Sequence, residues 1–140
     1  MTGTAVVVNG SDQLGVAPSS ERFKYKIKSM DKASESILAL KPVTFYYKKE
    51  IEPKDVPQFG LVAEEVEKVN RDLVVRDKEG KPYTVRYDAV NAMLLNEFLK
   101  EHRKVEQLEK RIEALTAGLQ KVSAQLEASK PITQVALKDQ

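Results

Sequence analysis

Few residues in this chain could perform nucleophilic chemistry. The sequence has no Cys and a single His, His102, which excludes disulfides, thiol catalysis, thiolate metal sites, a His-based metal site and a Ser-His triad. The remaining option is a serine hydroxyl beside a lysine amine. The sequence offers this pair in Pro18-Ser19-Ser20-Glu21-Arg22-Phe23-Lys24, where Ser19 precedes a basic stretch that contains Lys24.

A lysine amine acts as a base only when its pKa falls well below the usual ~10.4, a fall that burial and neighbouring cations favour. Arg22, Lys26 and Lys28 supply such cations close to Lys24. Taken alone, this pattern is more typical of a solvated turn followed by a solvated basic face than of a catalytic pair.

The composition indicates one modest domain with a helical appendage. Of 140 residues, 41% are apolar, 31% are charged and only 6% are aromatic, as expected when a long solvated helix adjoins a small globular part. Because basic and acidic residues are interleaved and the net charge is only +2, we expect neither nucleic acid nor a membrane as a partner. No metal or cofactor is expected.

The N-terminal half contains several extended patterns. Ala5–Val8 and Gln13–Val16 flank a turn cluster, which predicts two short strands that end before Pro18. Apolar residues then alternate with basic ones over Arg22–Lys28, which predicts a half-buried strand. Asp31 is the expected N-cap of a helix over Lys32–Leu40.

The remaining globular part predicts a mixed α+β fold. We expect a strand over Val43–Tyr47, a loop over Lys48–Pro57 and a helix over Ala63–Val69. Leu73–Arg76 and Tyr83–Tyr87 predict a hairpin around a Gly-containing loop. We expect the aromatic side chains to pack in the core rather than to bind sugars or nucleic acid.

The last element is a heptad repeat. Its apolar residues are Leu94, Phe98, Val105, Leu108, Ile112, Leu115, Leu119, Val122 and Leu126. Position a of the heptad is occupied by Val105, Ile112, Leu119 and Leu126. Position d is occupied by Leu108, Leu115 and Val122. A helix from about Asp88 to Ser129 cannot bury such a stripe by itself, so we expect a parallel homo-oligomer. The core residues leave dimer and trimer open.

The stretch from Ser19 to Lys24 resembles the Ser-Asp-x-Arg-x-Lys opening of the peptidase S74 family, the chaperone domains of phage endosialidases, tail fibres and neck appendages, found also in myelin regulatory factors. Three further segments follow in the family's order, namely Leu40–Tyr47, Phe59–Val66 and Val85–Asp88. The likeness runs from Ser19 to about Glu109.

The resemblance implies that three chains assemble into a homotrimer, bring an upstream fibre region of their own chain into register, and then cut themselves before the motif serine. Ser19 would be the nucleophile, Lys24 the general base and Pro18-Ser19 the cleaved bond, with Arg22 and Ser20 in supporting positions. Ser20 stands where the family usually has Asp. Such proteins belong to phage virions or bacterial surfaces.

The implied organisation has four parts. Residues 1–18 would be a short β remnant of the upstream fibre stalk, residues 19–87 the globular part, residues 88–129 the trimeric coiled coil, and residues 130–140 a polar tail. A non-cleaving module that trimerises or caps a fibre could use the same fold, and a ligand-binding module at a fibre tip is a third alternative.

Overall fold

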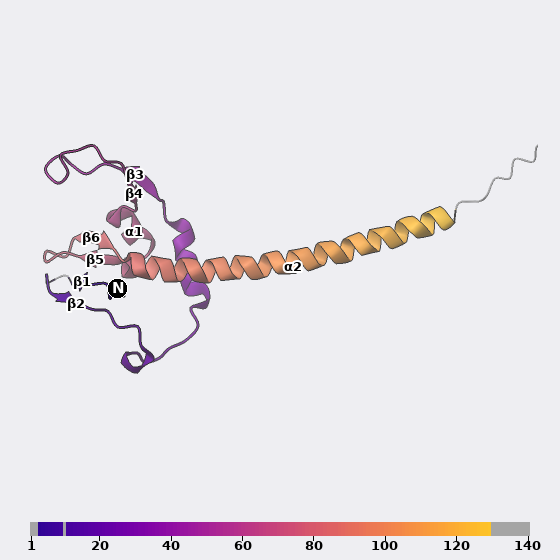
Figure 1. Ribbon diagram of the computed structural model, residues 1–140, viewed down its shortest axis with the longest axis horizontal. Coiled ribbons are helices and arrows are strands. Elements are labelled where there is room, and N and C mark those ends of the chain that lie inside the picture. The colour runs from indigo at the N-terminus through magenta and orange to yellow at the C-terminus, as the bar shows by residue number, and fades with distance from the viewer. Residues whose placement is uncertain (1–2, 10, 130–140) are drawn as a thin grey trace, which may run out of the picture. The chain divides into compact units, whose positions relative to one another are not determined.

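A computed structural model describes residues 3–9 and 11–129, and it shows small β-sheets, short helices and one long helix (Figure 1). The chain divides into two units, one reaching to Phe98 and one beginning at Leu99. The predicted mixed fold with a long C-terminal helix is therefore confirmed. The predicted polar tail lies outside the described residues.

Each sheet that the structure describes is an antiparallel pair of strands. The strands are β1 (Val7–Val8) with β2 (Leu14–Gly15), β3 (Val43–Phe45) with β4 (Gln58–Gly60), and β5 (Val74–Arg76) with β6 (Pro82–Val85). The first and last pairs confirm the two predicted strand pairs. The strand β4 was not predicted, because its Gly-containing sequence looks like the entry to the following helix.

The helices vary in type and length. They are the 3₁₀ helices η1 (Glu21–Phe23), η2 (Asp31–Ala39) and η3 (Arg71–Leu73) and the α-helices α1 (Ala63–Val69) and α2 (Tyr87–Ala128). The predicted helix over Ala63–Val69 is confirmed. The long helix begins one residue before Asp88 and ends one residue before Ser129, close to its predicted limits.

The helix η2 is a 3₁₀ helix because its inward-facing residues recur every three positions. Ser34 and Ile37 are buried, and Leu40 continues the same row. The predicted capping role of Asp31 is wrong. Asp31 lies inside the helix with a φ of 44°, and its carboxylate accepts a hydrogen bond from the Ser29 hydroxyl (2.8 Å) instead of capping the helix.

The predicted strand over Arg22–Lys28 is wrong for the single chain. Its first residues form η1, Lys26 adopts a φ of 53°, and none of the described sheets includes the segment. Tyr25 is 83% exposed, so the apolar face of this segment has nothing to cover it in one chain. Without a neighbouring strand, alternation alone does not hold an extended conformation.

The hydrophobic core is small and aliphatic. Its buried members are Ile37, Val66, Leu73, Val85 and Met93. The predicted aromatic core is therefore wrong, since Phe59 and Tyr83, among others, are largely exposed. Three separate two-stranded sheets cannot enclose large rings on both faces, so those rings remain at the surface.

A buried polar network joins η2 to α2. The Ser34 hydroxyl is fully buried, and it donates a hydrogen bond to the Glu97 carboxylate. The side-chain amide of Asn96 donates to the Ser34 hydroxyl (2.7 Å) and to the Asp31 carbonyl (3.1 Å). Because a buried polar atom is costly when it loses its partner, this network fixes how η2 lies on the first turns of α2.

A glycine allows the β3–β4 sheet to approach the start of α2. A Cβ atom at Gly60 would lie 2.8 Å from the Tyr87 hydroxyl and 3.3 Å from a ring carbon of Phe45. The same hydroxyl accepts a hydrogen bond from the Leu61 amide (3.0 Å). The position therefore requires glycine for space rather than for backbone conformation.

We expect Gly60→Ala to lower the free energy of unfolding by about 1–3 kcal/mol, because the added methyl collides with the Tyr87 hydroxyl. In a Tyr87→Phe background the cost of the same change should be smaller. Urea unfolding at fixed protein concentration measures both values. Gly15→Ala, which adds a methyl to open space, is the control. Equal costs at Gly60 and Gly15 would contradict this account.

We expect Ser34→Ala to destabilise the globular unit by about 1–3 kcal/mol, because it removes a donor from the buried Glu97 carboxylate. Ser36→Ala is the matched control on the same helix, since that half-buried hydroxyl accepts a hydrogen bond only from Asn70 (3.1 Å). The comparison uses urea unfolding monitored by circular dichroism. If the two substitutions cost the same, the network does not hold the helices together.

Candidate functional site

The candidate catalytic residues lie on an exposed part of the chain. Pro18, Ser19 and Ser20 are exposed and precede η1. The Ser20 carbonyl accepts a hydrogen bond from the Phe23 amide (3.1 Å), and the Lys24 amide donates to the Glu21 carbonyl (2.9 Å). These two backbone bonds shape a tight turn between the serines and Lys24.

The turn does not join the candidate catalytic side chains by a hydrogen bond. Among the described residues, no hydrogen bond joins Ser19 to Lys24, and both side chains face solvent in the single chain. A lysine amine becomes a base when burial removes its proton. The single chain thus contains both candidate groups, but it leaves them exposed to water.

Two cations near this turn lie over aromatic rings. The Arg22 guanidinium is 4.7 Å from the centre of the Phe23 ring, and the Lys26 amine is 5.7 Å from the centre of the Tyr25 ring. Cation–π contacts at exposed positions contribute only about 0.5–1 kcal/mol each. Arg22 therefore contacts its neighbour rather than Ser19 or Lys24.

The heptad stripe of α2 is uncovered. Its apolar members, from Leu94 to Leu126, are 47–71% exposed. The globular unit packs instead against Ala89, Met93 and Glu97, which occupy heptad positions f, c and g. These contacts leave the apolar positions of the stripe largely exposed to solvent in the single chain.

The acidic residues of α1 do not form a metal site. Lys68 donates to Glu65 (2.6 Å), and Arg76 forms an ion pair with Glu67. The part of the chain that the structure describes holds no group of three or more His, Cys, Asp or Glu side chains placed to bind a metal ion.

The hydrogen bond and the positive charge of Lys68 hold the pKa of the Glu65 carboxyl below its usual range. A lowered pKa stabilises the fold above the ordinary carboxyl range, and the contribution is lost as the pH falls through the lowered pKa. Because the Glu65 side chain is exposed, solvent and salt leave this contribution small.

The only histidine takes part in a contact within α2. The His102 ring nitrogen lies 3.7 Å from the Glu106 carboxylate, one helical turn further on, and both side chains are largely exposed. This geometry is that of an ordinary surface pair. It gives no support to a catalytic role.

Sequence reasoning missed the residues that join η2 to α2. Asn96 and Glu97 belong to a charged helix, and nothing in their spacing indicates that Glu97 is buried against Ser34. The contact joins residues more than sixty positions apart, so no local pattern could reveal it. The sequence did contain one indication that Ser34 is buried. Ser34 precedes Ile37 by three residues, which places both side chains on the same face of η2.

Within residues 3–9 and 11–129, no helix combines the length and the apolar character needed to cross a lipid bilayer. No curated protein matches the chain.

A comparison with protein families gives one match. Residues 19–75 match the Peptidase_S74 family, described as chaperone of endosialidase. The match begins at Ser19 and includes Lys24, the β3–β4 sheet and α1. The family resemblance predicted from the sequence is thus confirmed over residues 19–75, and its predicted extension to about Glu109 stays a prediction.

Proposed function

We propose that the chain is an intramolecular chaperone that assembles as a homotrimer, aligns an upstream fibre region of its own chain and then releases itself by cutting Pro18-Ser19. The observation that carries this proposal is the start of the family match at Ser19, the residue that would become the new N-terminus. The family's description as chaperone of endosialidase supports the chaperone role.

Assembly is supported by the uncovered stripe of α2. Burying a large aliphatic side chain contributes about 1.5–3 kcal/mol, and nine such positions repeat along the helix. A parallel bundle of three copies would cover this row while leaving each globular unit attached at the side of its own helix. The same association would set three upstream segments in equivalent positions.

The proposed chemistry needs only the residues of the turn. Neutral Lys24 removes the proton from the Ser19 hydroxyl, and the oxygen attacks the Pro18 carbonyl carbon. The bond from that carbon to the Ser19 nitrogen breaks as the protonated Lys24 returns the proton to the leaving amine. Water then hydrolyses the resulting ester, which yields a Pro18 carboxylate and a free Ser19 N-terminus.

Assembly would supply what the single chain lacks. We call residues Ser19 to Lys28 the motif segment. Its exposed apolar side chains, among them Phe23, Tyr25 and Ile27, alternate with its cations. A neighbouring chain that covers both this apolar face and the Lys24 side chain would exclude water from Lys24 and fix it near Ser19. In this proposal cleavage occurs only after correct association.

The runner-up is a non-cleaving module that trimerises or caps a fibre. Two observations favour it: the Ser19 and Lys24 side chains are both exposed in the single chain, and Ser20 stands where the resembling family usually has Asp. Both proposals share the assembly step, and they differ only in the mass of the purified chain.

We expect the wild-type chain to lose residues 1–18, and we expect Ser19→Ala and Lys24→Met to stay intact, because each removes one participant in the proton transfer. Ser11→Ala, which removes an exposed hydroxyl outside the motif, is the control and should still be cut. Intact-mass measurement after expression distinguishes the forms. Loss of residues 1–18 from the Ser19→Ala chain would exclude Ser19 as the nucleophile.

We expect Leu115→Asp to dissociate the assembly at micromolar concentration, because it places three carboxylates in the apolar seam. Ala117→Asp, at the outward position f of the same heptad, should leave the trimer intact. Sedimentation equilibrium measures the mass of each variant. The seam has no role in assembly if both variants keep the wild-type mass.

A further inference from the structure

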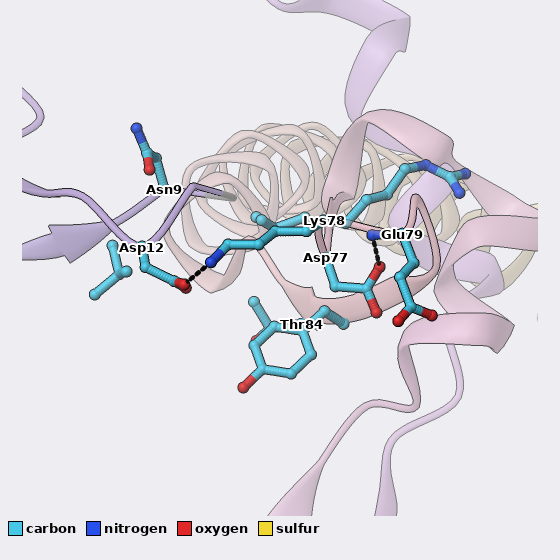
Figure 2. A pocket seen from close by; sticks show the side chains of 10 residues that line it. Asn9, Asp12, Asp77, Lys78, Glu79 and Thr84 are labelled. Atoms are coloured by element: carbon cyan, nitrogen blue, oxygen red, sulfur yellow. Dashed lines mark hydrogen bonds and ion pairs between the residues drawn. The ribbon is translucent and has the colours of Figure 1, made fainter.

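A pocket of about 470 Å³ lies between the turn of the upstream β1–β2 hairpin and the end of the β5–β6 hairpin. Figure 2 shows the Lys78 side chain reaching from the second hairpin toward the Asp12 carboxylate, with which it forms an ion pair. Val8 and Asn9 line the pocket from one side, and Tyr83 and Thr84 from the other. The contact joins residues 1–18 to the globular part.

The upstream turn is shaped by its own side chains. The Asn9 side-chain oxygen accepts hydrogen bonds from the amides of Ser11 (2.9 Å) and Gln13 (3.0 Å), and its amide group donates to the Gln13 side chain (2.9 Å). Asp12 has a φ of 60°, and its carboxylate points away from this hydrogen-bonded ring toward Lys78 (Figure 2). The acidic group is therefore presented by a turn that is already formed.

The opposite loop is shaped in the same manner. The Asp77 carboxylate accepts hydrogen bonds from the amides of Glu79 and Lys81, both at 2.9 Å, and Arg76 donates to the Gly80 carbonyl (2.6 Å). Lys81 pairs with Glu79 (2.7 Å). Lys78 pairs with Asp12 across the pocket, while Lys81 and Glu79 pair within the loop and Asp77 accepts bonds from its amides.

We infer that the loop Asp77–Lys81 is a docking surface for the acidic turn of the upstream segment, and that Lys78 and Asp12 are its principal contact. The inference rests on the proposed function, because it identifies where the chaperone holds its own client before cleavage. The partner is a short β-turn with a carboxylate at its tip.

The exposure of this contact makes it reversible. The side chains of Lys78 and Asp12 are 64% and 74% exposed, so water and salt screen their attraction. While Pro18 and Ser19 remain joined, the two hairpins are present at a high effective concentration and the weak contact suffices. After cleavage that advantage is lost, so the upstream segment leaves.

Cross-linking in the uncut chain tests the docking surface. The chain has no cysteine, so Val8→Cys with Thr84→Cys in a Ser19→Ala background gives a single reactive pair across the pocket. We expect a short bis-maleimide reagent to link this pair within one chain at least about tenfold faster than Val8→Cys with Lys54→Cys, because proximity raises the effective concentration. Lys54 lies in the loop between β3 and β4.

Charge variants of the same cysteine pair test the ion pair. Lys78→Glu should slow the link several-fold, Asp12→Lys together with Lys78→Glu should restore it, and Lys81→Glu should leave it unchanged. Equal rates for the two cysteine pairs, links formed only between chains, or no effect of Lys78→Glu would each overturn the inference. Since Ser19 is absent, these outcomes do not depend on whether the wild-type chain cuts itself.

Discussion

The arrangement of this protein depends on a hydrophobic stripe that one helix cannot bury. The apolar positions of α2 are half or more exposed along most of their length, while the globular unit attaches beside them through Met93 and the polar network of Ser34, Asn96 and Glu97. Apolar surface of this extent is stabilised only when other helices cover it. Association of several copies of the helix would meet that requirement, and the proposed trimer is one such assembly.

The motif segment also carries apolar side chains that one chain leaves uncovered. Ser19 and Lys24 stand on an exposed turn, and the apolar residues that follow them have no partner strand among the described sheets. Both the stripe and the motif segment are incomplete in one chain, and one association event would complete both. A self-cleaving chaperone needs such a link between assembly and chemistry, because cutting before assembly would release its client too early.

The sequence predicted the elements whose signals are local. The heptad spacing predicted the long helix, and Asp88 and Ser129 marked its ends to within one residue. The Gly-containing loop located the β5–β6 hairpin. Prediction from the sequence failed where an element depends on a second segment far away in the chain. The alternation after Arg22 indicates a strand, but no described strand of the single chain pairs with this segment. Ser34 and Glu97 could not be linked, because their contact depends on tertiary packing. The family motif located Ser19 and Lys24, but it could not show that both side chains are exposed in the single chain.

The central claim is that association completes the catalytic site, and the concentration dependence of cleavage tests it most directly. Unfolded wild-type chain would be diluted into refolding buffer over a wide range of final concentrations, and the appearance of the chain that begins at Ser19 would be followed by intact mass. Our account predicts that the half-time of cleavage shortens as the protein concentration rises, until the chemical step limits the rate. Cleavage with the same half-time at all concentrations, including those at which the chain is monomeric, would contradict it.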